Sequence, residues 1–300
     1  MQIGMLGLGR MGGNMTERLL RDGHSVVAAN RTAEAVAAAV KKGAIGAANL
    51  AGIVSTLKGR RVIWLMIPSG DPVEQAVLEL SGLLSPGDIV IDGGNSFYRD
   101  SVRRAGLLKE KGIHFLDSGT SGGVWGLKEG YCLMIGGDPE PFSYVEPVFK
   151  SLAPVKGYLH TGPVGSGHFV KMVHNGVEYG MMQAYAEGFE ILKEGPFPLN
   201  LTEVSELWQH GSVVRSWLLE LATDALRADP GLDHVKAWVD DSGEGRWTVE
   251  QAIETGVPAY AIAASLFARF ASRHDNAFGL RLLSALRNQF GGHAMKTIDS

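Results

Sequence analysis

The sequence predicts an α/β N-terminal half that folds as a doubly wound, mainly parallel sheet, followed by an all-helical C-terminal half. Short apolar runs alternate with helix-like segments as far as about residue 160, and a glycine cluster follows the first run. Long segments with a helical period fill the rest of the chain. Strands that alternate with helices indicate a parallel sheet with crossover helices. The predicted domains are therefore residues 1–162 and 163–300.

Six apolar runs are the predicted strands of the N-terminal half. Each run is continuous rather than alternating, which is typical of strands that are covered on both faces of a sheet. They occupy residues 3–8, 25–30, 61–67, 88–94, 114–120 and 131–137. Helices are therefore expected on both faces.

A segment at residues 153–167 separates the two halves. It is rich in glycine and proline and has few strong strand formers, so it predicts a linker. After it, the helical period is clearest over residues 180–193, 202–227 and 258–290, and no strand pattern recurs. These features place the domain boundary near residue 162.

The composition excludes several classes of protein. A formal net charge of -4, with scattered basic residues, gives no basic stripe for nucleic acid. The apolar run at residues 257–268 is too short to span a bilayer, and no secretory leader is recognisable, so a soluble, cytoplasmic protein is expected. Cys132 is the single cysteine, which precludes an intrachain disulfide, and it is expected to be a small buried hydrophobic residue.

A glycine cluster directly follows the first predicted strand and opens a helix. Gly7, Gly9 and Gly12 have the G-x-G-x-x-G spacing, with Arg10 and Met11 between the last two. In such turns one glycine makes the tight turn, one lets the backbone meet a pyrophosphate, and one lets the helix meet the strand. These five residues are the predicted pyrophosphate site of a Rossmann-type domain. A tight turn without a ligand is the alternative.

The end of the second predicted strand indicates which dinucleotide is bound. Asn30, Arg31 and Thr32 stand where an NAD-selective site usually offers a carboxylate to the ribose 2′-hydroxyl. Arg31 can instead stack on a 2′-phosphate and form a charge-assisted pair with it. NADP is therefore the expected preferred cofactor, with NAD as the second choice, although an arginine after a strand is also common on surfaces.

Two further predicted strands end in small and polar residues. Asn95 follows the fourth strand, and Ser121, Gly122 and Gly123 follow the fifth. In open α/β sheets ligands bind beyond the carboxyl ends of the strands, so Asn95 is expected to reach the nicotinamide ribose or the substrate. A turn built from glycine and asparagine, without a ligand, is the alternative.

A predicted helix in the middle of the chain has one unusual face. Lys171, His174, Asn175, Glu178 and Tyr179 fall within an arc of roughly 140° at 3.6 residues per turn, and the opposite side is apolar. A solvated polar face is the common alternative, but solvated faces usually carry stronger helix formers than His, Asn and Tyr. This face is therefore a candidate wall of an active site.

Four motifs, taken in order, resemble the decarboxylating 6-phosphogluconate dehydrogenases. They are the glycine fingerprint, DGGNS at residues 92–96, SGTSGG at residues 118–123 and KMVHNGVEYGMMQ at residues 171–183. The similarity continues through GRWTVEQAIETGVP, SLFARFASR and LRNQFGGH and covers most of the chain. With 300 residues the chain is similar to a short form of the family, because the larger members have a much longer helical domain.

The resemblance implies oxidative decarboxylation of 6-phosphogluconate to ribulose 5-phosphate and carbon dioxide, with reduction of NAD(P). It implies that Lys171 is the general base and Glu178 the general acid. The implied ligands of the phosphorylated sugar acid are Asn95, Ser121, Gly122, Gly123, His174, Asn175, Tyr179, Arg269, Arg287 and His293. Of these, Tyr179 and Arg269 are the implied phosphate ligands, and Asn95 also lies near the nicotinamide.

Two features of the second half bear on assembly and specificity. Arg287 and His293 resemble residues that family members supply from a neighbouring subunit, which implies a homodimer or homotetramer with a shared site. Ser242 stands where larger members carry a lysine that helps to bind the phosphate, and Arg246 is the nearby residue that could replace it. The resemblance therefore leaves phosphate affinity and substrate choice open.

The residue types suit the implied chemistry. A base must remove a hydroxyl proton while hydride leaves, and an acid must protonate the carbon left after decarboxylation. Burial in a closed cleft lowers the pKa of a lysine and makes the neutral amine available. No metal is needed and no histidine cluster suggests one; His160 and His168, which flank the linker, could be structural or ligating.

Two alternatives to this function remain. A β-hydroxyacid dehydrogenase or reductase, acting on a small 3-hydroxy acid without decarboxylation, shares the architecture and the helix lysine but lacks the DGGNS and HNGVEYG patterns. A nucleotide-sensing protein that has kept the fold and lost the chemistry is the alternative of another class. The filled base, acid and ligand positions argue against it.

Overall fold

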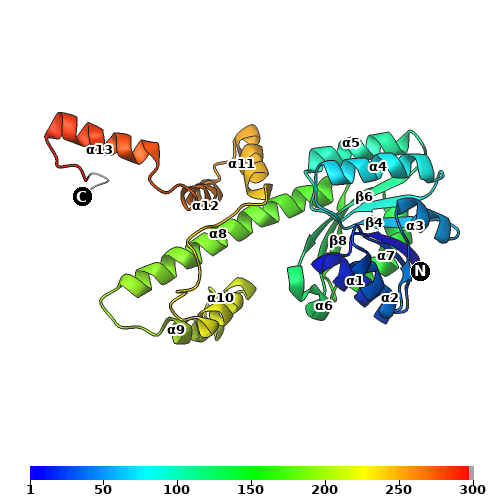
Figure 1. The fold of residues 1–300 in the computed structure, drawn as a ribbon, viewed down its shortest axis with the longest axis horizontal. Helices are drawn as coiled ribbons and strands as arrows, with labels where there is room; N and C mark the ends of the chain where they lie inside the picture. The colour runs from blue at the N-terminus through cyan, green and yellow to red at the C-terminus, as the bar shows by residue number, and fades with distance from the viewer. Residues whose placement is uncertain (297–300) are drawn as a thin grey trace. The chain divides into compact units, whose positions relative to one another are not determined.

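The computed structural model describes residues 1–296 of the chain, which divides into two compact units, Met1–His174 and Asn175–Ser300. The first unit holds an eight-stranded sheet with helices on both faces, and the second is helical in the part described (Figure 1). The predicted fold class is confirmed. Helix α8 (Ser166–Glu194) belongs to both units, and the domain boundary predicted at residue 162 stays a prediction.

The elements follow one another in a regular α/β order in the first unit. Its strands are β1 (Gln2–Leu6), β2 (Ser25–Ala29), β3 (Ile45–Gly46), β4 (Val62–Leu65), β5 (Ile89–Asp92), β6 (His114–Ser121), β7 (Cys132–Gly136) and β8 (Tyr158–Gly162). Its helices are α1 (Arg10–Arg21), α2 (Ala33–Lys41), α3 (Leu50–Thr56), α4 (Asp71–Leu83), α5 (Tyr98–Lys109), the 3-10 turn η1 (Gly123–Trp125), α6 (Gly126–Glu129) and α7 (Pro139–Leu152). After α8, the second unit has α9 (Leu201–Gln209), α10 (Trp217–Ala228), α11 (Glu244–Thr255), α12 (Tyr260–Ala271) and α13 (Phe278–Gly291).

The sheet has the strand order β3-β2-β1-β4-β5-β6-β7-β8. All neighbouring strands are parallel except β6 and β7. The order reverses between β1 and β4, so the carboxyl ends of these strands border the crevice in which open α/β sheets bind ligands. Helices α1, α2 and α7 pack on one face and α3, α4 and α5 on the other, which explains the continuous apolar strands (Figure 1).

All six predicted strands are present, and the structure has two further strands that were not predicted. β3 has only two residues, and β8 lies in the segment predicted as a linker. β8 pairs only with β7, at the edge of the sheet, and its side chains are mostly half-buried. An edge strand buries less apolar surface than a central one, so its sequence carries a weaker strand signal.

Two predicted helices are each broken in two. The segment at 202–227 divides into α9 and α10, and the segment at 258–290 into α12 and α13. Gly211 and Asn276, in the two breaks, have φ angles of 82° and 53°, which an α-helix cannot contain. Helix α11 is absent from the prediction.

Cys132 differs from its predicted environment. It is exposed, at the first residue of β7 and opposite Ser121, the last residue of β6. The end of a strand is less covered than its middle, which explains the exposure of a residue type that is usually buried. Within residues 1–296, the structure contains no helix long and apolar enough to cross a membrane.

Candidate active site

The glycine turn between β1 and α1 has the geometry of an anion site. Gly7 has a φ of 98°, and a Cβ there would lie 2.2 Å from the carbonyl oxygen of Met66. A Cβ on Gly12 would lie 2.0 Å from the carbonyl oxygen of Gly7, because helix and strand meet at this point. Gly9 precedes the first turn of α1, and the space that its Cβ would occupy is open. The N-terminus of α1 is therefore accessible to a phosphate group.

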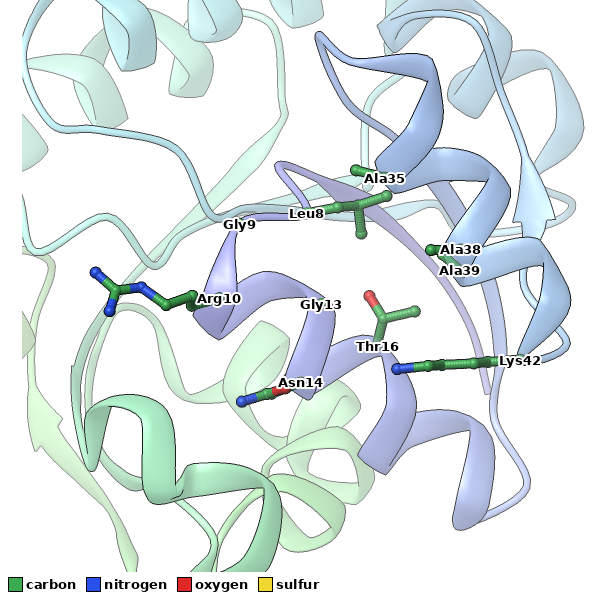
Figure 2. Close-up of a pocket in the computed structure, with 10 residues that line it drawn as sticks. All are labelled: Leu8, Gly9, Arg10, Gly13, Asn14, Thr16, Ala35, Ala38, Ala39 and Lys42. Atoms are coloured by element: carbon green, nitrogen blue, oxygen red, sulfur yellow. The ribbon is translucent and has the colours of Figure 1, made fainter.

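A pocket of about 230 Å³ begins at this turn and continues between α1 and α2 (Figure 2). It is lined by Leu8, Gly9, Arg10, Gly13, Asn14, Thr16, Ala35, Ala38, Ala39 and Lys42. Figure 2 shows the side chain of Arg10 directed away from α2. Two predicted cofactor residues, Gly9 and Arg10, thus line a pocket, whereas the side chain of Met11 packs against the hydrophobic core.

Asn30 ties the end of β2 to the glycine turn. Its Oδ1 accepts a hydrogen bond from the backbone N of Leu8 (3.0 Å), and its Nδ2 donates to Thr32 Oγ1 (2.8 Å). Arg31 is exposed between them and has no ion pair within the part of the chain that the structure describes. Its guanidinium is therefore available to an anion beyond the end of β2.

Asn95 joins the ends of β5 and β6. It has a φ of 53°, its Oδ1 accepts a hydrogen bond from Thr120 N (2.8 Å), and its Nδ2 donates to Thr120 O (3.1 Å). An asparagine amide has two N–H groups and two oxygen lone pairs, so one of each remains for a ligand. Ser121, the last residue of β6, follows Thr120, and Gly122 and Gly123 come next. The predicted site residues near the ends of β5 and β6 thus lie at the same, carboxyl, end of these two strands.

Helix α8 buries most of its polar side and exposes part of its apolar side. Lys171 is 5% exposed, and Asn175 and Tyr179 are also buried, while Val177 and Met181 are exposed. This is the reverse of a solvated amphipathic helix, so that alternative is wrong for α8. Buried polar groups need partners, which favours a face that contacts protein and ligand.

Lys171, His174 and Ser121 come together near the carboxyl end of β6. Lys171 Nζ lies 3.5 Å from His174 Nδ1, and His174 Nε2 lies 3.4 Å from Ser121 Oγ. Gly119 permits this approach, because a Cβ there would lie 2.4 Å from the Cβ of Lys171. An amine, an imidazole and a hydroxyl in one row can hold and exchange protons with a bound hydroxy acid.

In the second unit, Tyr179, Ser242 and Arg269 lie close together. The Arg269 guanidinium carbon is 3.6 Å from the centroid of the Tyr179 ring, and Arg269 Nη1 donates to the carbonyl oxygen of Asp240 (2.8 Å). The Tyr179 hydroxyl accepts a hydrogen bond from Ser242 N (3.2 Å), and Ser242 Oγ donates to the Glu244 carboxylate. Arg269 pairs with no carboxylate among the described residues, so its positive charge can attract an anion.

Arg246 has a different environment from Arg269. Its Nε donates to Asp241 Oδ2 (2.6 Å), and Arg273 also contacts Asp241 (2.8 Å). The hydrogen bond from Arg246, supported by Arg273, holds the pKa of the Asp241 carboxyl below its usual range. The charge of Arg246 is therefore already compensated, which makes Arg246 a weak candidate for binding a substrate phosphate.

The remaining predicted site residues are not all brought into these groups. Glu178 is half-buried on α8, one turn beyond His174. Arg287, on α13, and His293, after it, are both exposed. No hydrogen bond or ring contact joins either of them to Tyr179 within the described part of the chain. They stay predictions.

Apart from His168, the sequence did not single out the buried polar residues that support the site. Asp117 Oδ1 accepts a hydrogen bond from Gly165 N (2.6 Å), and its Oδ2 accepts one from His168 N (2.8 Å), which fixes the start of α8 beside β6. His168 Nδ1 bonds Ser101 Oγ (2.7 Å) in the interior, so this histidine is structural. Among residues 1–296 no group of three or more histidine, cysteine or acidic side chains could hold a metal ion.

Comparison with known proteins covers nearly the whole chain. Residues 2–162 match the NAD binding domain of 6-phosphogluconate dehydrogenase, and residues 167–278 match the 6-phosphogluconate dehydrogenase C-terminal domain. The chain is 46% identical, over 100% of both chains, to the NAD(+)-dependent, decarboxylating 6-phosphogluconate dehydrogenase of Haloferax volcanii. It is 37% identical to the decarboxylating enzyme of Schizosaccharomyces pombe, over 99% of this chain and 64% of that one.

A solved structure of Plasmodium falciparum 6-phosphogluconate dehydrogenase gives the same result. It superimposes with a TM-score of 0.84 at 30% identity, over 100% of this chain and 67% of that one. That protein is described in its apo form, with its cofactor NADP+ and with its substrate 6-phosphogluconate. The family matches, the full-length relative and this structure lead to one conclusion: the chain belongs to the 6-phosphogluconate dehydrogenase family.

Proposed function

We propose that the protein is an NAD(P)-dependent 6-phosphogluconate dehydrogenase that converts 6-phosphogluconate to ribulose 5-phosphate and carbon dioxide. The observation that carries the proposal is the buried Lys171 beside His174 and Ser121, in a chain that aligns end to end with a decarboxylating relative. An inactive nucleotide sensor would have no need of a buried amine at this place. The non-decarboxylating alternative is weaker, because a relative that matches over its full length is named as decarboxylating.

The proposed reaction assigns opposite tasks to Lys171 and Glu178. Lys171, as the neutral amine, takes the proton of the C3 hydroxyl, while the C3 hydrogen leaves as hydride. A nicotinamide cofactor held at the glycine turn would supply the acceptor of that hydride. The ammonium of Lys171 then polarises the new C3 carbonyl as the C1–C2 bond breaks and carbon dioxide departs, and Glu178 protonates C2 of the resulting enediol.

The ligands of the sugar acid are proposed along the same elements. Asn95, Ser121, Gly122, Gly123, His174 and Asn175 hold the carboxylate and hydroxyl groups, and Asn95 also contacts the nicotinamide ribose. Tyr179 and Arg269 bind the phosphate. The absence of a carboxylate partner for Arg269 in the described chain supports this role, since a compensated arginine binds phosphate less well.

The proposed cofactor site is the glycine turn together with the end of β2. Gly7, Gly9, Arg10, Met11 and Gly12 hold the pyrophosphate through the open N-terminus of α1. Asn30, Arg31 and Thr32 select the adenosine ribose, and Arg31 favours the 2′-phosphate of NADP. The Haloferax volcanii relative is named as NAD(+)-dependent, so the preference itself needs a direct measurement.

Replacing Arg31 with aspartate is expected to reverse the cofactor preference. The change removes a charge-assisted partner of the 2′-phosphate and adds a repulsive carboxylate, so the ratio of kcat/KM for NADP to that for NAD should fall by about 100-fold. Steady-state kinetics with both cofactors measure this ratio. A variant that keeps its preference for NADP would show that Arg31 does not select the cofactor.

The proposed assembly is a homodimer or homotetramer in which α13 and the segment after it reach a neighbouring site. No residue of α13 is buried, although this helix exposes Phe278, Leu280, Leu282, Leu283, Leu286 and Phe290. An apolar surface of this kind is typical of one that a partner covers. A second copy of the chain is the proposed partner, and it receives Arg287 and His293.

Mixed oligomers test whether sites are shared. At 6-phosphogluconate concentrations near the wild-type KM, Lys171→Met and Arg287→Ala are each expected to be nearly inactive. A mixture refolded or expressed together should recover about a quarter of the wild-type activity, because half the sites of each mixed dimer are intact. Recovery requires that the two residues of one site come from different chains. An active monomer in analytical ultracentrifugation, or no recovery in the mixture, would contradict the shared site.

The substrate is tested by the appearance of reduced nicotinamide. The protein is incubated with NADP or NAD and either 6-phosphogluconate or 3-hydroxypropanoate, a small 3-hydroxy acid. The proposal predicts rapid reduction only with the phosphorylated sugar acid. Reduction with the small acid alone would instead support the non-decarboxylating dehydrogenase, and binding of cofactor without any turnover would support the sensor.

A further inference from the structure

A buried carboxylate, Asp92, shapes the loop after β5. It is the last residue of β5 and is 0% exposed. Its Oδ1 accepts a hydrogen bond from Gly94 N (3.0 Å), and its Oδ2 accepts one from Ser96 Oγ (2.7 Å). Asn95 lies between these two bonded residues, so the carboxylate holds the loop in the conformation in which Asn95 has a positive φ.

The geometry set by Asp92 extends to the next strand through Asn95. Both polar atoms of the Asn95 side chain bond the backbone of Thr120, which precedes Ser121. A shift of the loop at residues 92–96 would therefore move Asn95 away from β6 or break these bonds. Asp92 thus fixes the spacing between the ends of β5 and β6 without facing the ligand itself.

Arg104, on α5, connects Asp92 to a third loop. Arg104 is 1% exposed, and its Nη1 lies 3.5 Å from Asp92 Oδ2. Its Nη2 donates to the carbonyl oxygen of Gly70 (3.1 Å), before α4, and its Nε donates to Glu74 (2.9 Å). Hydrogen bonds from Arg103 and Arg104 lower the pKa of Glu74 to about 2, so this carboxylate stays charged at neutral pH. Arg104 thereby links the loops that follow β4 and β5, and Asn95 links the loop after β5 to the carboxyl end of β6.

Stability alone is a weak reason for such a buried pair. Removing two charges from water is costly, and apolar replacements of a whole buried ion pair are often neutral or stabilising. Loss of one partner is strongly destabilising, because the other charge is then left uncompensated. A buried ion pair at the carboxyl end of β5, the end at which open α/β sheets bind ligands, is better explained by the geometry that it imposes.

We infer that Asp92 and Arg104 are positioning residues of the reaction, which hold Asn95 where the nicotinamide ribose and the sugar acid meet. The identity of these ligands rests on the proposed function. Neither residue touches the reacting atoms; both act through the loop at residues 92–96. Catalysis should therefore depend on the pair more strongly than folding does.

The test compares Asp92→Asn, Arg104→Met and the double variant with the matched control Arg103→Met. Arg103 bonds the same Glu74 carboxylate (2.6 Å) but is exposed, and in the described chain it donates otherwise only to Asp100. Each single variant is expected to lower the melting temperature. With 6-phosphogluconate and NADP both saturating, it should also lower kcat by about 10- to 100-fold. The double variant should regain melting temperature while kcat stays low, and the control should keep its kcat.

Two results would overturn the inference. One is recovery of kcat together with melting temperature in the double variant; the other is an equal loss of kcat in Arg103→Met. The first would show that the pair acts only on folding, and the second that the loss of kcat is not specific to Asp92 and Arg104.

Calorimetric binding of NADP and of adenosine 2′,5′-bisphosphate, which lacks the nicotinamide half, adds a readout that does not need turnover. The variants should bind NADP more weakly and adenosine 2′,5′-bisphosphate as tightly as the wild type does. An equal loss of affinity for both ligands would also contradict the inference. An inactive wild type would refute the proposed reaction, whereas an active wild type whose variants keep their kcat would refute only the positioning role.

Discussion

Replacing Lys171 with methionine is expected to lower kcat for 6-phosphogluconate by about 1,000-fold, within the range found for loss of a general base. The side chain of methionine has a similar length and is apolar, so it keeps the packing against Gly119 and removes the amine. Cofactor binding should be unchanged, because the glycine turn lies on another strand end. Single-turnover kinetics, with reduced nicotinamide as the signal, measure the loss directly.

Lys171→Arg is the matched control for charge. Arginine keeps a cation near His174 and Ser121 but cannot lose a proton at neutral pH, so it should be as inactive as Lys171→Met. If the arginine variant keeps substantial activity, the positive charge matters more than the base, and the proposed role of Lys171 is wrong. Binding of the nicotinamide cofactor, measured by calorimetry, distinguishes both outcomes from misfolding.

Replacing Arg269 with alanine is expected to raise the KM for 6-phosphogluconate by about 10- to 100-fold, because one or two charge-assisted hydrogen bonds to the phosphate are lost. Arg269 stacks on Tyr179 and has no carboxylate partner in the described chain, so its charge is available to the substrate. The kcat at saturating substrate should change much less than the KM. The measurement is a full substrate titration at saturating cofactor.

Arg246→Ala is the control for this prediction. Arg246 is paired with Asp241 and should affect the KM only slightly, although loss of the pair can lower stability. A KM effect at Arg246 as large as that at Arg269 would move the phosphate subsite to the start of α11. Turnover of gluconate, which lacks the phosphate, should be equally slow in the wild type and in Arg269→Ala.

Most of the fold is predictable from the sequence because the central strands are buried on both faces. Such strands read as continuous apolar runs, and all six of these runs are strands. β8 lacks that signal because it is an edge strand with half-buried side chains among glycine and proline. The breaks before α10 and α13 depend on single residues with positive φ, which a helical period does not reveal.

The candidate site is predictable from the sequence only where residue type and spacing together indicate a function. The glycine spacing predicts the turn between β1 and α1, and the close approaches at Gly7 and Gly12 give the physical reason for it. Asp92 opens the DGGNS motif, but Arg104, twelve residues further on, belongs to no motif, so their contact becomes visible only in the folded chain. The exposure of Cys132 likewise depends on its place at the end of β7, which its residue type does not indicate.

The proposed reaction both oxidises and decarboxylates the substrate. The most direct measurement incubates the protein with carboxyl-labelled 6-phosphogluconate and NADP, and then quantifies reduced nicotinamide and trapped labelled carbon dioxide from the same reaction. Equal molar amounts of the two products are expected. Reduced nicotinamide without labelled carbon dioxide would contradict the proposed reaction.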